Sequence, residues 1–255
     1  RRSSDLVKGN DNRDPHPQLT IDNKKVRLDK LGDYIVTYTC KDRSGNKIVA
    51  KRKVSVVEKK EIGVYAQTEE KVIYLTFDDG PSKNTKRILD ILDKYHAKAT
   101  FFVTGTNQNY NYLIKEAYQR GHTIGLHTYS HDYKTVYTSV TAYFNDLERV
   151  GNMVKNEIGF IPKYIRFPGG ASNTISRKYC PGIMSILANE VIDRGYQFYD
   201  WNYGTGDAGG NNIPVNQIIA TATAGNANNQ VILAHDTDAK NTTVEDRKST
   251  RLNSS

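Results

Sequence analysis

From Lys71 onward the sequence alternates between short apolar runs and longer segments with helical spacing. The apolar runs have the length and composition of strands and lie at 72–77, 99–103, 123–126, 164–167, 197–201 and 231–234. Segments with an apolar stripe at helical spacing lie between them, at 88–95, 112–120, 140–157, 183–194 and 215–222. Strands that alternate with helices lie parallel to one another. The pattern therefore predicts an α/β fold built on a parallel sheet or barrel.

Polar, chemically versatile residues follow most of these runs. In parallel barrels, ligands bind at the carboxyl ends of the strands. Five of the six predicted strands end in such residues, whereas the second ends in Thr104-Gly105-Thr106. We therefore expect a functional site at the carboxyl edge of the sheet.

The first predicted strand ends in the pair Asp78-Asp79, followed by Gly80-Pro81. Neighbouring side chains on an extended chain point in opposite directions, so the two carboxylates can have different roles. A bend at Gly80 would instead bring both to one rim. The alternative is an ordinary turn that caps the next helix, because Asp-Asp-Gly is a common turn sequence.

Two histidines, His127 and His131, follow the third predicted strand. If their segment is helical, residues four apart share a face, and both imidazoles can reach one ion at about 2.0–2.1 Å. An aspartate from the first strand end would complete an Asp-His-His set with open coordination positions, which is the layout of a catalytic metal site. This spacing alone also arises by chance, so the hypothesis depends on its combination with the aspartate pair.

Five short segments occur in a fixed order along this part of the chain: TFDDGP at 76–81, HTYSH at 127–131, RFPGG at 166–170, DW at 200–201 and LAHD at 233–236. Together they resemble the five motifs of the polysaccharide deacetylase family, carbohydrate esterase family 4. The resemblance covers roughly residues 71–245 and implies a distorted (β/α) barrel as the catalytic domain. Residues 246–255 carry no apolar stripe, so we expect the barrel to lack its last helix and strand and to end in a disordered, foreign tail.

The resemblance also implies a metal centre and a proton-transfer pair. Asp79, His127 and His131 are implied to hold a divalent metal, with Zn²⁺ expected and Co²⁺ or Mn²⁺ as alternatives. Asp78 is implied to be the general base that takes a proton from water. His235 is implied to be the general acid that protonates the leaving nitrogen.

Two further charged residues are implied to tune this pair. Arg166 would contact Asp78 and keep it ionised, and Asp200 would orient His235 and favour its protonated form. The alternatives are an ordinary salt bridge for Arg166 and a solvated carboxylate at a strand end for Asp200.

Three residues are implied to contact the acetyl group. The backbone N–H of Gly169 would face the oxyanion, and Trp201 and Leu233 would form a small apolar pocket for the methyl group. Core packing is the alternative role for Trp201.

These residues point to a metal-dependent hydrolase that removes N-acetyl groups from a polymer containing N-acetylglucosamine, with peptidoglycan or a chitin-like glycan as the partner. The sequence does not separate an amide from an ester, so an O-acetyl xylan esterase of the same family stays open. A carbohydrate-binding protein with an impaired site is a third alternative, and the complete set of implied catalytic residues argues against it.

The N-terminal part has a different pattern. Alternating segments at 35–40 and 48–57, separated by the turn-forming residues 42–46, predict a β-hairpin. The segment resembles the last strands of a bacterial immunoglobulin-like module. We therefore expect a partial all-β module at 13–58, a charged linker at 59–70, and a disordered or foreign segment at 1–12.

The composition indicates which kind of partner and which cellular location to expect. The net charge of +8 suits an anionic polymer such as a bacterial wall, and no nucleic-acid-binding signature is present. No apolar stretch approaches the roughly 20 residues of a membrane helix. We expect a monomer outside the cell or at the cell wall, with any export signal upstream of this sequence.

Cys40 and Cys180 lie in different predicted modules, and we expect both to be unpaired.

Overall fold

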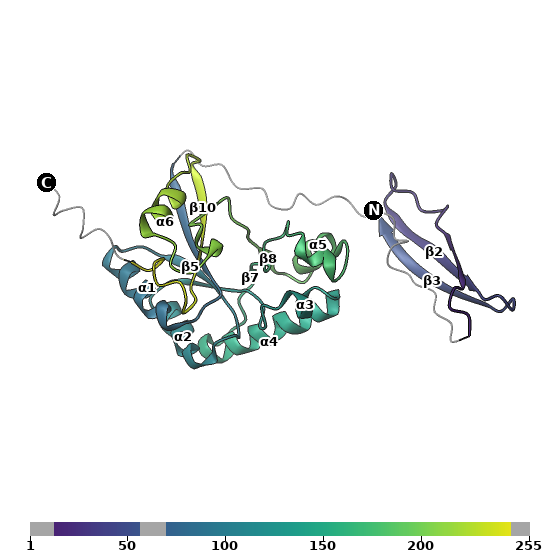
Figure 1. Ribbon diagram of the computed structural model, residues 1–255, viewed down its shortest axis with the longest axis horizontal. Helices are drawn as coiled ribbons and strands as arrows, with labels where there is room; N and C mark the ends of the chain where they lie inside the picture. Colours follow the sequence, from purple (N-terminus) through teal and green to yellow (C-terminus); the bar gives the residue numbers. More distant parts are fainter. Residues whose placement is uncertain (1–12, 57–69, 246–255) are drawn as a thin grey trace. The chain divides into compact units, whose positions relative to one another are not determined.

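The protein divides into two compact units, Arg1–Glu61 and Ile62–Ser255 (Figure 1). The structure is a computed structural model that describes residues 13–56 of the first unit and 70–245 of the second. The predicted terminal segments and nearly all of the predicted linker lie outside the described residues.

The first unit is a three-stranded antiparallel sheet in the order β1-β2-β3. Its strands are β1 (Gln18–Asp22), β2 (Gly32–Lys41) and β3 (Lys47–Val56). The predicted hairpin is confirmed as β2 and β3, and β2 buries Val36 and Tyr38. Strand β1 was not predicted, because its sequence QLTID carries only two apolar residues.

The second unit contains a seven-stranded sheet in the order β8-β7-β6-β5-β4-β10-β9, in which every pairing is parallel. The strands are β4 (Val72–Asp78), β5 (Ala99–Val103), β6 (Thr123–Leu126), β7 (Tyr164–Ile165), β8 (Gln197–Phe198), β9 (Tyr203–Gly204) and β10 (Asn229–His235). The prediction of a parallel sheet is confirmed. Strand β9 was missed because two residues are too short to form a recognisable apolar run.

Helices follow most of the strands, as the alternation predicted. They are α1 (Lys83–Lys94), α2 (Tyr112–Gln119), α3 (Tyr133–Val136), α4 (Val140–Ile158), α5 (Ile183–Asp193) and α6 (Val215–Ala222). Short 3₁₀ turns lie at η2 (Gln108–Tyr110), η3 (Ile175–Lys178) and η4 (Asp207–Gly209). The core forms between these helices and the sheet, where Leu89, Leu126, Val150, Ile165 and Leu187 are almost completely buried. None of the helices in the described residues has the length and apolar character to span a membrane.

The sheet is curled, and a non-strand segment closes it. Strands β8 and β9 lie at opposite edges of the sheet, although only residues 199–202 separate them in sequence. The side chain of Arg166, which is fully buried, donates from Nε to the backbone oxygen of Tyr199 at 2.9 Å and from Nη2 to that of Asp200 at 3.1 Å. The closing segment is thus held from inside by a guanidinium group, which gives the distorted barrel that the resemblance implied.

The N-cap of helix α1 is Ser82, directly before the first helical residue, Lys83. The Ser82 side chain accepts a hydrogen bond from Asn84 N, and the Thr85 side chain accepts one from Ser82 N, so the two residues form a capping box. This cap matters for the site because Ser82 directly follows the turn that carries the aspartate pair.

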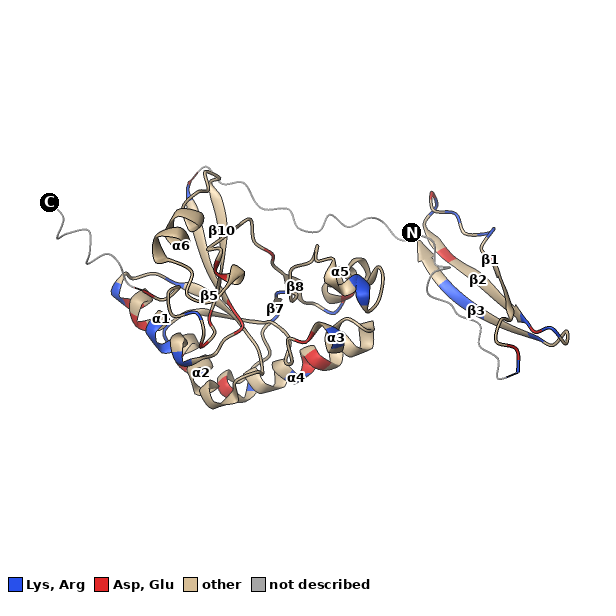
Figure 2. Cartoon of the chain, viewed as in Figure 1, with Lys and Arg blue, Asp and Glu red and all other residues tan. Residues whose placement is uncertain are grey.

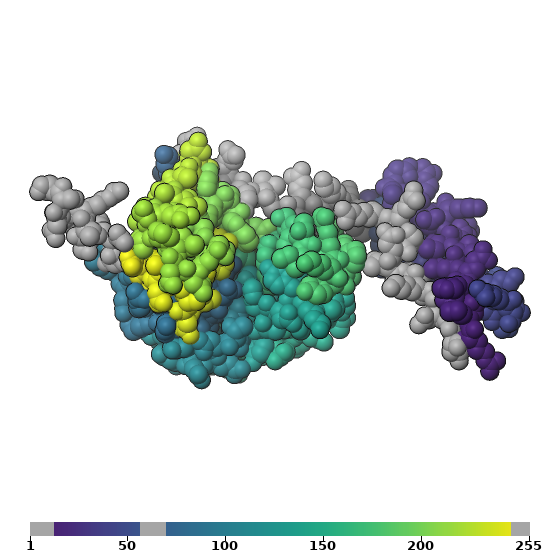
Figure 3. All heavy atoms as spheres, in the orientation of Figure 1, coloured from purple at the N-terminus to yellow at the C-terminus, as the bar shows by residue number. Residues whose placement is uncertain are grey.

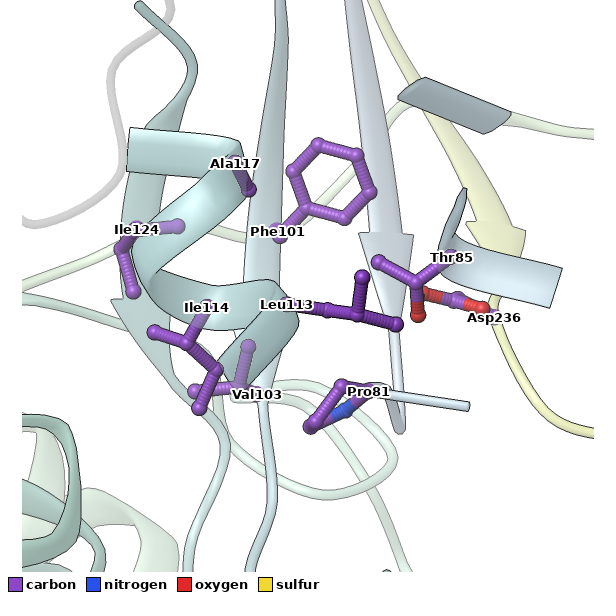
Figure 4. Close-up of a pocket in the computed structure, with 9 residues that line it drawn as sticks. All are labelled: Pro81, Thr85, Phe101, Val103, Leu113, Ile114, Ala117, Ile124 and Asp236. Carbon is purple, nitrogen blue, oxygen red and sulfur yellow. The ribbon is translucent and has the colours of Figure 1, made fainter. Parts of the chain in front are cut away.

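A small cavity of about 10 Å³ lies between α2 and the sheet (Figure 4). Its walls are apolar side chains such as Leu113 of α2 and Phe101 of β5, and Thr85 and Asp236 stand at its edge. A cavity of this size has about the space that one water molecule needs, so it is no sugar-binding site. The outer surface is hollowed elsewhere, between the part that carries α6 and the part that carries α5 (Figure 3).

Cys40 and Cys180 are both free, as predicted. After β10 the described chain continues through turns to Glu245, and Val244 is buried in the core.

Candidate active site

Residues from four strand ends meet at the carboxyl edge of the sheet. Asp78 ends β4 and lies in register with His235 at the end of β10. His127 follows β6, and Arg166 follows β7. The edge predicted to carry the site therefore brings together the candidates for base, acid and metal ligand.

The two adjacent aspartates lie at one rim, because the chain bends at Asp79, beyond the end of β4: His127 Nε2 is 3.6 Å from Asp78 Oδ2 and 3.6 Å from Asp79 Oδ1. Asp78 is 2 % exposed and points to Arg166, whereas Asp79 has a φ of +74° and turns its carboxylate to the two histidines. Thr104 stabilises this turn: its Oγ1 donates to the backbone oxygen of Asp79 at 3.0 Å, and its N–H donates to that of Gly80 at 2.8 Å. The second strand end, which carries no motif residue, thus supports the first.

Asp79, His127 and His131 form one cluster whose possible ligand atoms all lie within 4.8 Å of one another. Asp79 Oδ1 is 3.3 Å from His131 Nε2 and 3.6 Å from His127 Nε2. This oxygen is buried and has no hydrogen-bond partner among the described residues. A buried carboxylate oxygen without a donor is costly unless a cation neutralises it.

The protonation state of His127 also suits a metal ligand. Its Nδ1 lies 2.8 Å from the backbone oxygen of Arg166, and because a carbonyl only accepts, Nδ1 carries the proton. The lone pair of Nε2 then faces the oxygen of Asp79. Burial lowers the pKa of His127 to about 3, so the ring is neutral at physiological pH. One carboxylate and two imidazole rings fit a divalent metal ion.

The segment between the two histidines is a loop, so the helical geometry considered from the spacing is wrong. Residues 127–131 contain no helix, and Thr128 and His131 have φ values of +69° and +50°. The carboxylate of Asp146, which is buried on α4, accepts hydrogen bonds from the backbone N–H groups of Tyr129 at 2.5 Å and Ser130 at 3.1 Å. Backbone bends held by Asp146, rather than a helix face, bring the histidines together.

Asp78 has the surroundings of a general base. Its Oδ1 accepts a hydrogen bond from Arg166 Nη1 at 2.8 Å, and its Oδ2 lies 3.6 Å from His127 Nε2. The predicted contact with Arg166 is present. Burial raises the pKa of Asp78, however, and outweighs the lowering caused by Arg166. The prediction that Arg166 keeps Asp78 ionised therefore describes only the weaker of two opposing effects.

His235 is oriented by Asp207, and the prediction of Asp200 for this role is wrong. His235 Nδ1 lies 2.7 Å from Asp207 Oδ1, and Asp207 Oδ2 accepts a hydrogen bond from the backbone N–H of His235 at 2.9 Å. The carboxylate of Asp200 instead accepts from the backbone N–H of Ala171 at 2.9 and 3.1 Å. Asp200 lies in the barrel-closing segment, before the chain reaches β10, whereas Asp207 follows β9, which pairs with β10.

The acid and its partner shift each other's pKa. Burial alone would lower the pKa of His235, but the hydrogen bond and charge of Asp207 outweigh it, so the pKa is raised. Burial would raise the pKa of Asp207, but the hydrogen bond to His235 reverses this, so its pKa is lowered. Lys240 adds support by donating from Nζ to the backbone oxygen of Asp207 at 2.6 Å.

Comparison with known proteins shows which family this chain belongs to. Residues 65–180 match the family model for polysaccharide deacetylases. The structure is similar to the catalytic domain of a peptidoglycan N-acetylglucosamine deacetylase from Eubacterium rectale, with 46% sequence identity and a TM-score of 0.65 over 69% of this chain and 83% of that one. The chain belongs to the polysaccharide deacetylase family.

Curated relatives in the family carry more than one substrate name. A peptidoglycan-N-acetylglucosamine deacetylase of Bacillus cereus is 34% identical over 174 residues, which are 66% of this chain and 60% of the relative. A bifunctional xylanase/deacetylase of Pseudobutyrivibrio xylanivorans is 31% identical over 69% of this chain and 27% of the relative. The chain therefore spans less than two thirds of the length of these relatives.

The residues predicted to contact the acetyl group lie near the same edge of the sheet. Trp201 is half-buried, and its ring centroid is 5.4 Å from Cζ of Arg166. Leu233, also half-buried, pairs in register with Thr76 and precedes His235 by two residues, so both side chains lie on one face of β10. Gly169 has a φ of +75°, and no hydrogen bond from its N–H is found within the described residues. The acetyl pocket and the oxyanion contact stay predictions.

Sequence reasoning missed three residues that build this site, namely Asp207, Asp146 and Thr104. Asp207 stands in a glycine-rich stretch without an apolar run, where its proximity to β10 depends on the pairing of a two-residue strand. Asp146 belongs to the polar positions of a long helix, and its burial follows only from the way α4 packs under the histidine loop. The Thr104-Gly105-Thr106 strand end was the one available signal, since it occupies the position at which the other strands carry site residues.

Proposed function

We propose that this polysaccharide deacetylase is a metal-dependent hydrolase that removes N-acetyl groups from an N-acetylglucosamine-containing polymer, with peptidoglycan as the substrate. One observation carries the proposal: the base candidate Asp78, the Asp79 cluster and the His235–Asp207 pair converge at one edge of the sheet. Amide hydrolysis needs an activated water, a stabilised oxyanion and a proton for the leaving nitrogen, and this edge provides residues suited to each.

Asp79, His127 and His131 would hold the ion, for which we propose Zn²⁺, with Co²⁺ or Mn²⁺ as alternatives. When bound, such an ion supplies a Lewis acid and lowers the pKa of water toward about 7. Asp78 Oδ2, which the hydrogen bond from Arg166 leaves free, takes the proton from water. Its raised pKa brings the base closer to the working pH.

His235 completes the proton transfer. Because Nδ1 is held by Asp207, the remaining ring nitrogen, Nε2, is the one that can donate to the departing amine. The raised pKa of His235 keeps more of the ring protonated near neutral pH. The same contact fixes the orientation of the ring, so His235 is set to act as an acid while Asp78 acts as a base.

Three features support peptidoglycan as the substrate and an extracellular or cell-wall location. Relatives that are named for peptidoglycan deacetylation match this chain over about two thirds of its length. The net charge is +8, and exposed basic residues lie along β3, among them Lys51 and Arg52 (Figure 2). We further propose that the first unit is part of an immunoglobulin-like module and that the protein is a monomer.

The deciding experiment is the release of acetate from peptidoglycan, chitooligosaccharides and acetylxylan, each with and without a chelator. We expect chelator-sensitive release from the two N-acetylated substrates, and its loss in the Asp78→Asn variant. The similarity to a bifunctional xylanase/deacetylase favours the second candidate, an O-acetyl esterase. Release from acetylxylan alone would select that candidate, and the absence of release from all three substrates would refute both.

A further inference from the structure

We propose that Tyr133, which lies outside the five sequence motifs, is a further catalytic residue that donates a hydrogen bond from its hydroxyl to the acetyl oxygen of the substrate. The proposal rests on the proposed deacetylase function. It begins with a close approach between this side chain and Gly169, the residue whose N–H is predicted to face the oxyanion.

The hydroxyl of Tyr133 lies next to the position that a side chain on Gly169 would take. A Cβ placed on Gly169 would be 2.5 Å from the Tyr133 hydroxyl oxygen and 3.3 Å from its ring carbon Cε1. Real Cβ atoms do not approach other heavy atoms at 2.5 Å. Position 169 thus needs glycine for two reasons, its φ of +75° and the space that Tyr133 occupies. The missing side chain leaves room for the hydroxyl next to Gly169.

Tyr133 is held firmly in this position. It begins α3, where the side chain of Asp132 caps the helix by accepting from Lys134 N at 3.2 Å. Its ring meets the ring of the metal-ligand candidate His131 edge-on, with centroids 6.0 Å apart and planes at 85°. On its other side it packs against Tyr137 at 5.6 Å. The hydroxyl therefore reaches Gly169 from a side chain fixed between the cluster and the core.

The hydroxyl is left available to a ligand. Throughout residues 13–56 and 70–245, no group forms a hydrogen bond with the Tyr133 hydroxyl, and the residue is half-buried. The neighbouring Tyr137 differs, since its hydroxyl is buried and donates to the backbone oxygen of Pro168 at 2.8 Å. One tyrosine anchors the loop that carries Gly169, and the other presents its O–H beside that loop.

An acetyl oxygen at this point would receive two hydrogen bonds, from Gly169 N–H and from Tyr133 O–H. As water adds to the carbonyl carbon, the C=O π electrons move to the oxygen, and both hydrogen bonds strengthen with its growing negative charge. Tyr133 keeps its proton throughout, because a phenol is a donor at neutral pH. The proposed role is stabilisation of the oxyanion, with no bond to Tyr133 formed or broken.

The first test is Tyr133→Phe, which keeps the ring and removes the donor. Loss of one oxyanion donor typically lowers kcat by about 10²–10³-fold, so we expect a fall toward that range with KM nearly unchanged. Bound metal and thermal unfolding should match the parent protein. The control is Tyr118→Phe, which removes the hydroxyl of a 44% exposed tyrosine on α2 and should leave kcat unchanged. A parent-like kcat in Tyr133→Phe would overturn the proposal.

The second test needs no turnover. Acetohydroxamate presents an acetyl oxygen to the metal-loaded protein, and calorimetry measures its affinity. Loss of one hydrogen bond, worth about 1–1.5 kcal/mol, predicts binding about tenfold weaker in Tyr133→Phe and unchanged in Tyr118→Phe. Equal affinity in the parent and Tyr133→Phe contradicts the role of Tyr133 alone. Absence of acetate release by the parent on every glycan contradicts the proposed function instead.

Discussion

Replacing Asp207 by Asn should lower the pKa of His235 and move the alkaline limb of the kcat/KM profile to lower pH. The limb is expected to report His235 because the acid must be protonated to donate to the leaving nitrogen. In the parent protein, burial acts to lower this pKa, and the carboxylate of Asp207 at 2.7 Å overcomes it. Without that charge, burial is opposed only by weaker interactions.

The size of the shift follows from the contact that is lost. A hydrogen bond to a charged group contributes about 1.5–3 kcal/mol, and one pKa unit corresponds to about 1.4 kcal/mol. The alkaline limb should therefore move down by about one to two pH units. The Asp207→Asn variant would also lose an acceptor, since Asp207 accepts from both the ring and the backbone N–H of His235. An asparagine has only one acceptor oxygen for these two N–H groups, so kcat should fall as well.

The assay compares kcat/KM against pH for the parent, Asp207→Asn and Asp200→Asn, with NMR titration of the labelled His235 ring as the direct measurement. Asp200→Asn is the matched control, because the Asp200 carboxylate binds Ala171 N rather than the acid. The limb should stay in place in this control. If it stays in place in Asp207→Asn while the NMR pKa of His235 falls, the limb reports water at the metal site, which also titrates near neutrality. An unchanged NMR pKa of His235 in Asp207→Asn would refute the electrostatic argument itself.

Four further outcomes are expected. His131→Ala should remove bound metal and activity together, measured by elemental analysis and acetate release, and a full equivalent of metal in the variant would contradict the ligand assignment. Asp78→Asn should keep the metal and lose turnover, because it removes the proposed base and no proposed ligand. Asp146→Ala should weaken metal affinity in a chelator competition, since the histidine loop loses the acceptor for two backbone N–H groups. Burial raises the pKa of Asp236 to about 7, so the parent's unfolding free energy should fall between about pH 4 and pH 7 relative to that of Asp236→Asn.

The sign of the Asp236 effect follows from its surroundings. The carboxyl stands at the edge of an apolar cavity, and hydrogen bonds from Ser82 and Thr85 offset only part of the cost of burying its charge. Because the folded-state pKa lies above the unfolded value, the folded state is favoured at low pH and loses this advantage as Asp236 ionises. Asparagine is neutral throughout, so its stability curve should be flatter, and parallel curves would contradict the shift.

Much of the fold was accessible from the sequence, because its signals are local. The apolar runs at 99–103 and 123–126 coincide with β5 and β6, and the helical pattern at 215–222 coincides with α6. A strand that is buried on both faces must be continuously apolar, so the sequence alone indicates which residues form it. Strands β7 and β8 are shorter than their predicted runs because the chain leaves the sheet at Arg166 and at the closing segment.

The site was only partly accessible, for a physical reason that Asp200 and Asp207 illustrate. Both are acidic residues in one stretch that follows β8, and the nearby Trp201 made Asp200 the better match to a motif. Which of the two reaches His235 depends on the path of residues 199–207 across the open edge of the barrel. That path is fixed by long-range contacts, such as the pairing of Tyr203 with Ile232, and these leave no local pattern.

Arg166 contacts both the barrel-closing segment and Asp78, the proposed base. Its guanidinium donates to Thr76 Oγ1 and Asp78 Oδ1 on β4 and to the backbone oxygens of Tyr199 and Asp200 on the closing segment. A planar group with several donors in fixed directions can satisfy these acceptors together, whereas a lysine ammonium cannot match the same geometry. The buried positive charge needs Asp78 as its partner, and the guanidinium supplies donors to two backbone carbonyls that lie outside the strands. Closure of the barrel and positioning of the base are therefore two consequences of one side chain, so a change at Arg166 would alter both.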